Sequence, residues 1–191
     1  MLYKWRCPIR IISGEFKGRK LKGPLGLSIR PTLDRVKESI FNVLGSNIGD
    51  TRVLDLFAGS GSLGLEALSR GASHVYFIDN ASESIELVKY NIELIPQTKN
   101  KNTVVKSDAA DFLKGFSDFV WDYVFLDPPF KIEETKMTEI FNILFYSRII
   151  DENSVIIYEF FFKRNIEAEI GNFNIFKTSV FGEKKVVYLS K

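Results

Sequence analysis

The sequence predicts a single α/β domain of the doubly wound type, in which helices cover both faces of a parallel sheet. The chain has 191 residues, 45% of them hydrophobic, which is enough for one domain with a buried core. From residue 52 onward, short apolar segments alternate with segments whose apolar residues recur at helical spacing. This alternation is typical of parallel strands joined by helices. A glycine-rich turn follows the first apolar segment, where such sheets bind their ligands.

The chain before residue 52 is expected to form a hairpin followed by a helix. Residues 9–21 have the pattern of two short extended pieces joined at Ser13-Gly14, which predicts a hairpin. A helix is predicted to open at Pro31-Thr32, with Thr32 as its candidate N-cap. Its apolar residues recur at helical spacing until Gly45, which ends the helix.

The alternating part of the chain gives the order of the remaining elements. Strands are predicted at 52–57, 74–79, 103–106, 121–127 and 154–161. Helices are predicted at 62–70, 82–94, near 111–114 and at 134–147. Two last strands, near 172–180 and at 185–189, surround Gly182 and would close the sheet with an antiparallel hairpin.

Charge is distributed unevenly along the chain. The net charge is +2, yet residues 1–37 carry ten basic and only two acidic side chains, and the rest of the chain carries 16 basic and 22 acidic ones. Basic residues on a structured surface bind phosphates without reading sequence, whereas the bland alternative is a solvated charged face. The first 37 residues are therefore a candidate surface for a polyanion.

Composition excludes several classes of protein. Cys7 is the single cysteine, so no intrachain disulfide can form, and we expect a reducing, cytoplasmic location. One cysteine and one histidine make a zinc site of the usual kind implausible, so no metal is expected. No stretch approaches the roughly 18 apolar residues of a membrane span, and residues 1–10 lack the apolar core of a secretory signal, so no membrane association is expected.

The loop after the first alternating strand has the pattern G-x-G-x-x-G. Glycines there let the chain turn tightly and let a ligand approach the backbone, and the next helix offers free N–H groups. Asp79 closes the following strand, where an acid can accept hydrogen bonds from both ribose hydroxyls of a cofactor. The candidate cofactor-binding residues in this region are Ala58, Gly59, Ser60, Gly61, Gly64, Asp79 and Asn80.

The glycine loop alone does not distinguish NAD from S-adenosyl-L-methionine, because both contain adenosine. Asp55, inside the strand before the loop, favours S-adenosyl-L-methionine. A carboxylate there can engage the cationic amino-acid end of this cofactor, whereas it would repel the pyrophosphate of NAD. The alternative is that Asp55 only caps the end of the strand.

The tetrapeptide Asp127-Pro128-Pro129-Phe130 follows the apolar residues of a predicted strand. In a doubly wound sheet, this place lies beside the glycine loop. The two prolines fix the backbone and remove two N–H donors. The Asp127 carboxylate and the Pro128 carbonyl can then hold the two hydrogens of an exocyclic amino group, while Phe130 stacks on the base. Asp127, Pro128 and Phe130 are therefore candidate catalytic residues for methyl transfer to a base, the alternative being a Pro-Pro strand terminator.

Five segments of the chain resemble one family. They are RIISGEFKGRKLKGP at 10–24, RPTLDRVKESIFNVL at 30–44, VLDLFAGSGSLGLEALSRGA at 53–72, LDPPF at 126–130 and GEKKVVYL at 182–189. Together they resemble the bacterial 16S rRNA guanine-N2 methyltransferases that modify guanine 966. The resemblance spans nearly the whole chain and implies a Rossmann-like class I methyltransferase that uses S-adenosyl-L-methionine. Many relatives have Glu in place of Asp79 and Tyr in place of Phe130, and both replacements keep the function of the position.

The resemblance also implies roles for further residues. Asp108 and Ala109 resemble the family's segment that reads the adenine amino group, although Asp108 could equally cap a helix. Thr32 and Arg30 resemble the segment that closes over the methionine end and the target. Residues 1–30 would form a basic RNA-binding extension, and residues 31–191 the methyltransferase domain. The candidate RNA-binding residues are Arg10, Lys17, Arg19, Lys20, Lys22 and Arg30.

The implied partner is 16S rRNA in an assembling 30S particle, and we expect a monomer. Three alternatives stay open. A DNA adenine-N6 methyltransferase shares the loop and the tetrapeptide, but 191 residues leave little room for a separate DNA target-recognition domain. The others are an NAD-binding oxidoreductase and a ribosome-assembly factor that binds RNA without chemistry.

Overall fold

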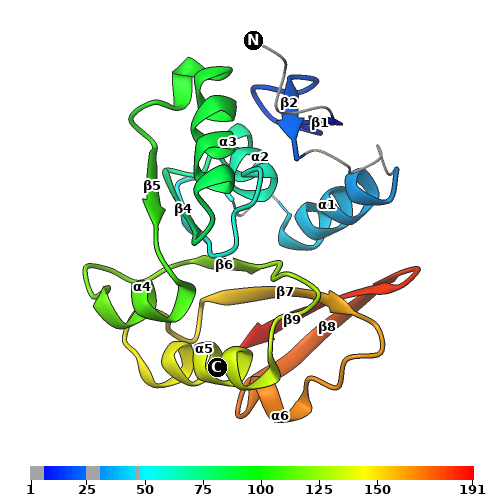
Figure 1. The fold of residues 1–191 in the computed structure, drawn as a ribbon, viewed down its shortest axis with the longest axis vertical. Coiled ribbons are helices and arrows are strands. Elements are labelled where there is room, and N and C mark those ends of the chain that lie inside the picture. The colour runs from blue at the N-terminus through cyan, green and yellow to red at the C-terminus, as the bar shows by residue number, and fades with distance from the viewer. Residues whose placement is uncertain (1–6, 25–30, 46–47) are drawn as a thin grey trace.

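The computed structural model describes residues 7–24, 31–45 and 48–191, and its main sheet has the predicted architecture (Figure 1). Across the sheet the strands are β5 (Asn102–Lys106), β4 (His74–Asp79), β3 (Arg52–Asp55), β6 (Tyr123–Leu126), β7 (Val155–Phe161), β9 (Lys184–Ser190) and β8 (Asn174–Phe181). The pairs among the first five strands are parallel, whereas β9 is antiparallel to both β7 and β8. The prediction of a mostly parallel sheet closed by an antiparallel hairpin is confirmed.

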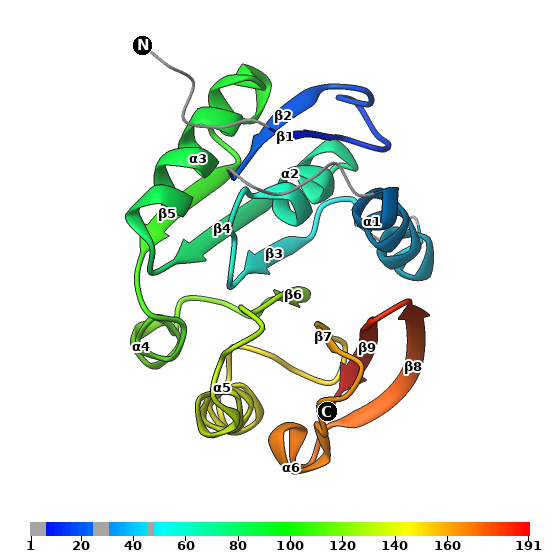
Figure 2. The same cartoon turned by 45° about the vertical axis from the view of Figure 1, so that its right-hand side comes forward.

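Helices cover both faces of this sheet (Figure 2). One face carries α1 (Pro31–Leu44), α2 (Ser62–Ser69) and α3 (Ser82–Glu93). The other carries α4 (Ala109–Gly115), α5 (Glu134–Tyr146) and α6 (Glu167–Ile170). Each layer has its own cluster of buried apolar side chains, as a two-faced sheet requires.

The structure corrects three details of the predicted elements. Helix α1 begins at Pro31, so Thr32 lies in the first turn and not at the N-cap. Proline suits the first helical position because its missing N–H needs no partner there. The one-turn helix α6 and the 3-10 helix Pro96–Thr98 were not predicted, since neither is long enough to show a periodic pattern.

The N-terminal hairpin forms a separate two-stranded sheet. Its strands β1 (Cys7–Arg10) and β2 (Lys20–Gly23) are antiparallel, with Ile9 opposite Leu21. The hairpin lies over α2 and α3 (Figure 2), and its buried Ile11 and Leu21 belong to the same apolar cluster as the α1–α3 layer. The predicted hairpin is therefore present, while the division into an RNA-binding extension and a methyltransferase domain stays a prediction.

The strand order reverses between β3 and β6. From β3 the chain moves outward through β4 to β5, then returns to β6 on the other side of β3 and continues to β7. Ligands of doubly wound sheets bind beyond the carboxyl ends of the strands at such a reversal. The glycine loop follows β3 and the tetrapeptide follows β6, so the fold places both at this point.

No helix within 7–24, 31–45 and 48–191 is long and apolar enough to cross a membrane. In the same ranges, no group of three or more His, Cys, Asp or Glu side chains is arranged to hold a metal ion.

Candidate active site

The glycine loop turns sharply between β3 and α2. Gly59 and Gly61 have φ angles of 54° and 75°, in the left-handed region that glycine adopts without a steric penalty. Gly64 serves packing, because a Cβ atom there would lie 2.3 Å from Cε1 of Phe77. A glycine at this position lets α2 lie directly on β4.

Two carboxylates hold the loop in place. Asp55 Oδ2 accepts a hydrogen bond from the Gly64 N–H at 3.0 Å, and Asp79 Oδ2 accepts one from the Gly59 N–H at 2.9 Å. Asp55 is 2% exposed, and this burial raises its pKa to about 7, although the Gly64 hydrogen bond opposes the rise. The strand-end role considered for Asp55 is thus present, and the same side chain also borders a cavity.

This first cavity, which we call the loop cavity, has a volume of about 220 Å³. The glycine loop contributes Ala58, Gly59 and Ser60 to its wall, next to Asp55. Helix α1 and the hairpin supply other parts of the wall, among them Asp34, Lys37, Ile9 and Pro24. The glycine loop, helix α1 and the hairpin therefore all contribute to the wall of the space where the cofactor is predicted.

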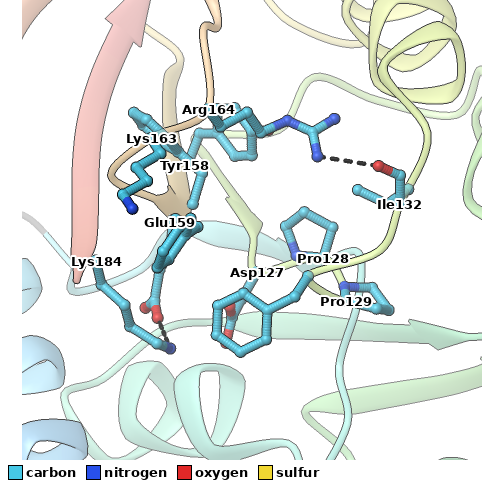
Figure 3. A pocket seen from close by; sticks show the side chains of 12 residues that line it. Asp127, Pro128, Pro129, Ile132, Tyr158, Glu159, Lys163, Arg164 and Lys184 are labelled. Carbon is cyan, nitrogen blue, oxygen red and sulfur yellow. Dashed lines mark hydrogen bonds and ion pairs between the residues drawn. The ribbon is translucent and has the colours of Figure 1, made fainter.

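A second cavity of about 270 Å³, the tetrapeptide cavity, opens beside Asp127-Pro128-Pro129-Phe130 (Figure 3). The Phe130 ring is 69% exposed. It meets the Phe161 ring edge-on, with 6.3 Å between the ring centroids, and the Lys184 ammonium lies 5.6 Å from its centroid. An exposed aromatic ring at the mouth of a cavity is available for stacking.

Asp127 and Glu159 line both cavities. Glu159 on β7 is 6% exposed and forms an ion pair with Lys184 of β9 (Figure 3). The surrounding protein raises the pKa of Asp127 to about 7, the Glu159 charge adds to the rise, and Lys184 opposes it. Asp127 is nevertheless exposed to solvent. The boundary between the cavities thus carries two neighbouring carboxylates.

Buried polar side chains of α2 hold the hairpin. Glu66 is fully buried and accepts hydrogen bonds from the backbone N–H groups of Ile12 at 2.8 Å and Ser13 at 3.0 Å. Ser69 Oγ accepts from the Phe16 N–H at 3.0 Å and donates to the Ser13 carbonyl at 2.6 Å. These contacts give the hairpin a fixed position on α2.

Two more buried side chains connect the hairpin with the glycine loop. Asn91 of α3 accepts from the Lys22 N–H at 2.7 Å and donates to the carbonyls of Lys22 and Ser60, both at 2.9 Å. Lys37 donates to the Arg10 carbonyl at 2.6 Å and to Ser62 Oγ at 3.1 Å. Burial lowers the pKa of Lys37, and the nearby Glu66 charge opposes this.

Some predicted cofactor-binding residues do not line either of the two cavities. Asp108 caps α4 by accepting from the Ala110 N–H at 2.9 Å, and it pairs with Lys136 at 2.8 Å. The cap alternative for Asp108 is therefore realised. The residues that line neither cavity are Gly61, Gly64, Asp79, Asn80, Asp108 and Ala109. Their roles toward a cofactor stay predictions.

Four of the predicted RNA-binding side chains are exposed on the hairpin, and we call them the hairpin cations: Arg10, Lys17, Arg19 and Lys20. Arg10 also pairs with Asp34 at 2.9 Å. Lys22 is partly buried, and its backbone is bonded to Asn91. Arg30 and the side chain of Thr32 lie outside the described residues.

Sequence reasoning missed the functional candidates Glu159 and Lys184. Glu159 carried a signal, because it interrupts an otherwise apolar strand. Glu66 and Asn91 were missed as well, although each is a polar residue on the apolar face of a helix. A buried polar side chain implies a partner, but the sequence does not show which partner it has.

Comparison with known proteins decides the family. The family model described as conserved hypothetical protein 95 matches residues 9–190. The chain belongs to this family. A similar protein, the putative rRNA methyltransferase YlbH of Bacillus subtilis, is 37% identical over 185 residues, which cover 96% of this chain and 99% of that protein.

Other relatives agree with this membership of the conserved hypothetical protein 95 family. Ribosomal RNA small subunit methyltransferase D of Escherichia coli is 45% identical over 133 residues, covering 66% of this chain and 64% of that protein. The solved structure of the putative methyltransferase yhhF from Escherichia coli has a TM-score of 0.81 at 32% identity, covering 96% and 98% of the two chains. The predicted resemblance to a bacterial rRNA methyltransferase family is confirmed.

A more distant structure supports the fold alone. SMU.776, a putative methyltransferase solved in complex with SAH, matches with a TM-score of 0.72 at 20% identity. The match covers 91% of this chain and 54% of that protein. The predicted methyltransferase fold is therefore confirmed by both a near and a distant structure.

Proposed function

We propose that this protein transfers a methyl group from S-adenosyl-L-methionine to the exocyclic N2 of a guanine in 16S rRNA, at position 966. The observation that carries the proposal is the pair of cavities that share Asp127 and Glu159. A methyl group must pass directly between cofactor and base, so residues bordering both spaces lie at the point of transfer. The rRNA methyltransferase names of the relatives support RNA as the substrate.

Asp55 of the loop cavity, and Asp79, which is bonded to the cavity residue Gly59, fit this cofactor chemically. Asp55 offers a buried carboxylate that can pair with the ammonium group of an amino acid. Asp79 holds the Gly59 N–H, and its remaining lone pairs can accept from ribose hydroxyls. When bound, S-adenosyl-L-methionine supplies a methyl group that its sulfonium makes electrophilic.

The tetrapeptide makes the exocyclic N2 of the guanine a better nucleophile. Asp127 and the Pro128 carbonyl accept the two amino hydrogens, which draws the nitrogen lone pair out of conjugation with the ring. Phe130 stacks on the base, and a stack of this kind contributes about 1–3 kcal/mol. As the N–C bond forms, the nitrogen releases one proton to Asp127 or to water. Correct positioning supplies much of the rate enhancement.

The hairpin cations are the proposed binding surface for the RNA. They are exposed, and the polar contacts of Glu66, Ser69 and Asn91 fix the hairpin over the face of the sheet that carries α2 and α3. Such cations bind phosphates and position the RNA without reading its sequence. We place this monomeric enzyme in the cytoplasm, acting on an assembling 30S particle.

Mass spectrometry of 16S rRNA from cells lacking the gene tests the proposal. One N2-methylguanine should be missing, and the wild-type gene should restore it, whereas the Asp127→Ala gene should not. Tritiated methyl transfer to rRNA, 30S particles and DNA in parallel distinguishes the DNA alternative. An unchanged set of rRNA modifications, or transfer to DNA alone, would refute the proposed function.

A further inference from the structure

Glu159 is a buried carboxylate at the boundary of the two cavities, and the mechanism above does not use it. We propose that Glu159 selects guanine by accepting a hydrogen bond from the N1–H group of the base. This inference rests on the proposed function and names the residue that sets its base specificity.

The sheet places Glu159 next to Asp127. Strands β6 and β7 are parallel, and Leu126 is paired with Tyr158. Asp127 directly follows the last residue of β6, and Glu159 directly follows Tyr158 on β7, so the two residues are neighbours where the pairing of these strands ends. The two carboxylates therefore lie side by side, and both line the two cavities.

Three RNA bases carry an exocyclic amino group, and they differ in the ring atom beside it. In guanine the neighbour of N2 on the Watson–Crick edge is N1–H, a donor. In adenine the neighbour of N6 is N1, and in cytosine the neighbour of N4 is N3, and both are acceptors. Enzymes that act on an extruded base read this edge by hydrogen bonds. A second carboxylate beside Asp127 thus accepts a hydrogen bond from N1–H of guanine and repels the lone pair on N1 of adenine or N3 of cytosine.

Lys184 supports this role. Its ammonium group pairs with the Glu159 carboxylate and lies 5.6 Å from the centroid of the Phe130 ring (Figure 3). An ion-paired carboxylate offers only acceptors, and its two oxygens have room for further hydrogen bonds. The pairing also reduces the cost of burying the Glu159 charge. The cavity therefore presents a group that can only accept hydrogen bonds and cannot donate one.

The test compares guanine with 2-aminopurine, which keeps the N2 amino group but has an acceptor at N1. Small-subunit rRNA is prepared by ligation with either base at the methylated position. The wild-type protein should methylate guanine about 10- to 100-fold faster than 2-aminopurine, the range expected for a hydrogen bond to a charged group. With S-adenosylhomocysteine present, the dissociation constants of the two RNAs should differ in the same direction.

The variant Glu159→Gln should reduce this preference for guanine at least about tenfold, because an amide presents a donor as well as an acceptor. Glu159→Asp keeps the charge and should retain the preference at a lower rate. Glu183→Gln, at an exposed acid that directly precedes the cavity residue Lys184, is the matched control and should leave the preference unchanged. Calorimetry with S-adenosyl-L-methionine and thermal unfolding verify that the variants are folded.

Two results would overturn the inference. One is equal use of guanine and 2-aminopurine by the wild-type protein, which needs no variant. The other is an unchanged preference in folded Glu159→Gln. Both leave N2-methylguanine as the product and the proposed function intact. A wild-type protein that forms no N2-methylguanine would instead refute the proposed function itself.

Discussion

Replacing Gly14 by alanine should weaken the attachment of the hairpin to α2. Gly14 has a φ of +83°, and a Cβ atom there would lie 1.8 Å from the carbonyl oxygen of Ser69. Three hydrogen bonds depend on this close approach: Glu15 N–H to Ser69 O at 2.7 Å, Phe16 N–H to Ser69 Oγ at 3.0 Å, and Ser69 Oγ to Ser13 O at 2.6 Å. Their loss, at about 1 kcal/mol each, would cost about 3 kcal/mol of the free energy of unfolding.

The same hairpin contains a matched control. Gly18 also has a φ of +83°, but a Cβ atom there meets nothing within 4 Å. Gly18→Ala therefore carries only the cost of the left-handed conformation, about 1–2 kcal/mol, which Gly14→Ala shares. The difference between the two variants isolates the contact with Ser69.

Thermal unfolding followed by circular dichroism measures this difference. For a protein of this size, about 3 kcal/mol corresponds to a Tm lower by about 6–12 °C in Gly14→Ala than in Gly18→Ala. Methyl transfer to RNA should also fall more in Gly14→Ala, because the hairpin cations lose their fixed position. Equal Tm values for the two variants would refute the reasoning that Ser69 holds the hairpin.

Four further predictions concern the site and the hairpin cations. Asp127→Asn should lower the rate of methyl transfer about 10²–10⁴-fold. The same variant should unfold at a higher temperature than the wild type near pH 8, because the folded protein disfavours the Asp127 charge. Because the pKa of Asp127 is raised toward about 7, wild-type kcat/KM should rise with pH between about pH 5 and about pH 8 as the carboxylate forms, and a flat profile would contradict this assignment. Gly64→Ala should lower the free energy of unfolding, measured by urea denaturation, by about 1–3 kcal/mol or more, since the new Cβ would lie 2.3 Å from the Phe77 ring. In the control Gly115→Ala the new Cβ meets nothing within 4 Å, so this variant should be nearly neutral. If the four hairpin cations contact phosphates, raising salt from about 50 to about 200 mM should weaken RNA binding about 50- to 150-fold, while calorimetry should show a much smaller change for S-adenosyl-L-methionine.

The central part of the fold could be predicted because its signals are local. Strand β3, the glycine loop and α2 occupy one continuous stretch, and each has its own pattern of apolar residues or glycines. The tetrapeptide at 127–130 is likewise continuous. The doubly wound order then brings the two together, because ligands gather where the strand order reverses.

The remaining parts of the site depend on contacts between distant segments. The pair of Glu159 with Lys184 forms because β7 and β9 are antiparallel in one particular register, and no local pattern encodes that register. The contacts of Glu66 and Asn91 with the hairpin join residues more than 50 positions apart. At Asp108 the local signal itself was ambiguous, because an aspartate there fits both a cofactor contact and a helix cap. The structure shows the helix cap.

The contacts of Asn91 and Lys37 make the hairpin a poor candidate for modular exchange. Each of these buried side chains bonds to the hairpin backbone and to the region where the glycine loop leads into α2. Deleting or transplanting the hairpin would leave an amide and an ammonium group inside the protein with part of their bonding lost, which is costly in a dry interior. A chimera with a foreign RNA-binding element would therefore have to supply backbone carbonyls at the same two places. Substrate recognition in this protein can thus diverge by changes on the exposed side of the hairpin more readily than by replacing the hairpin as a whole.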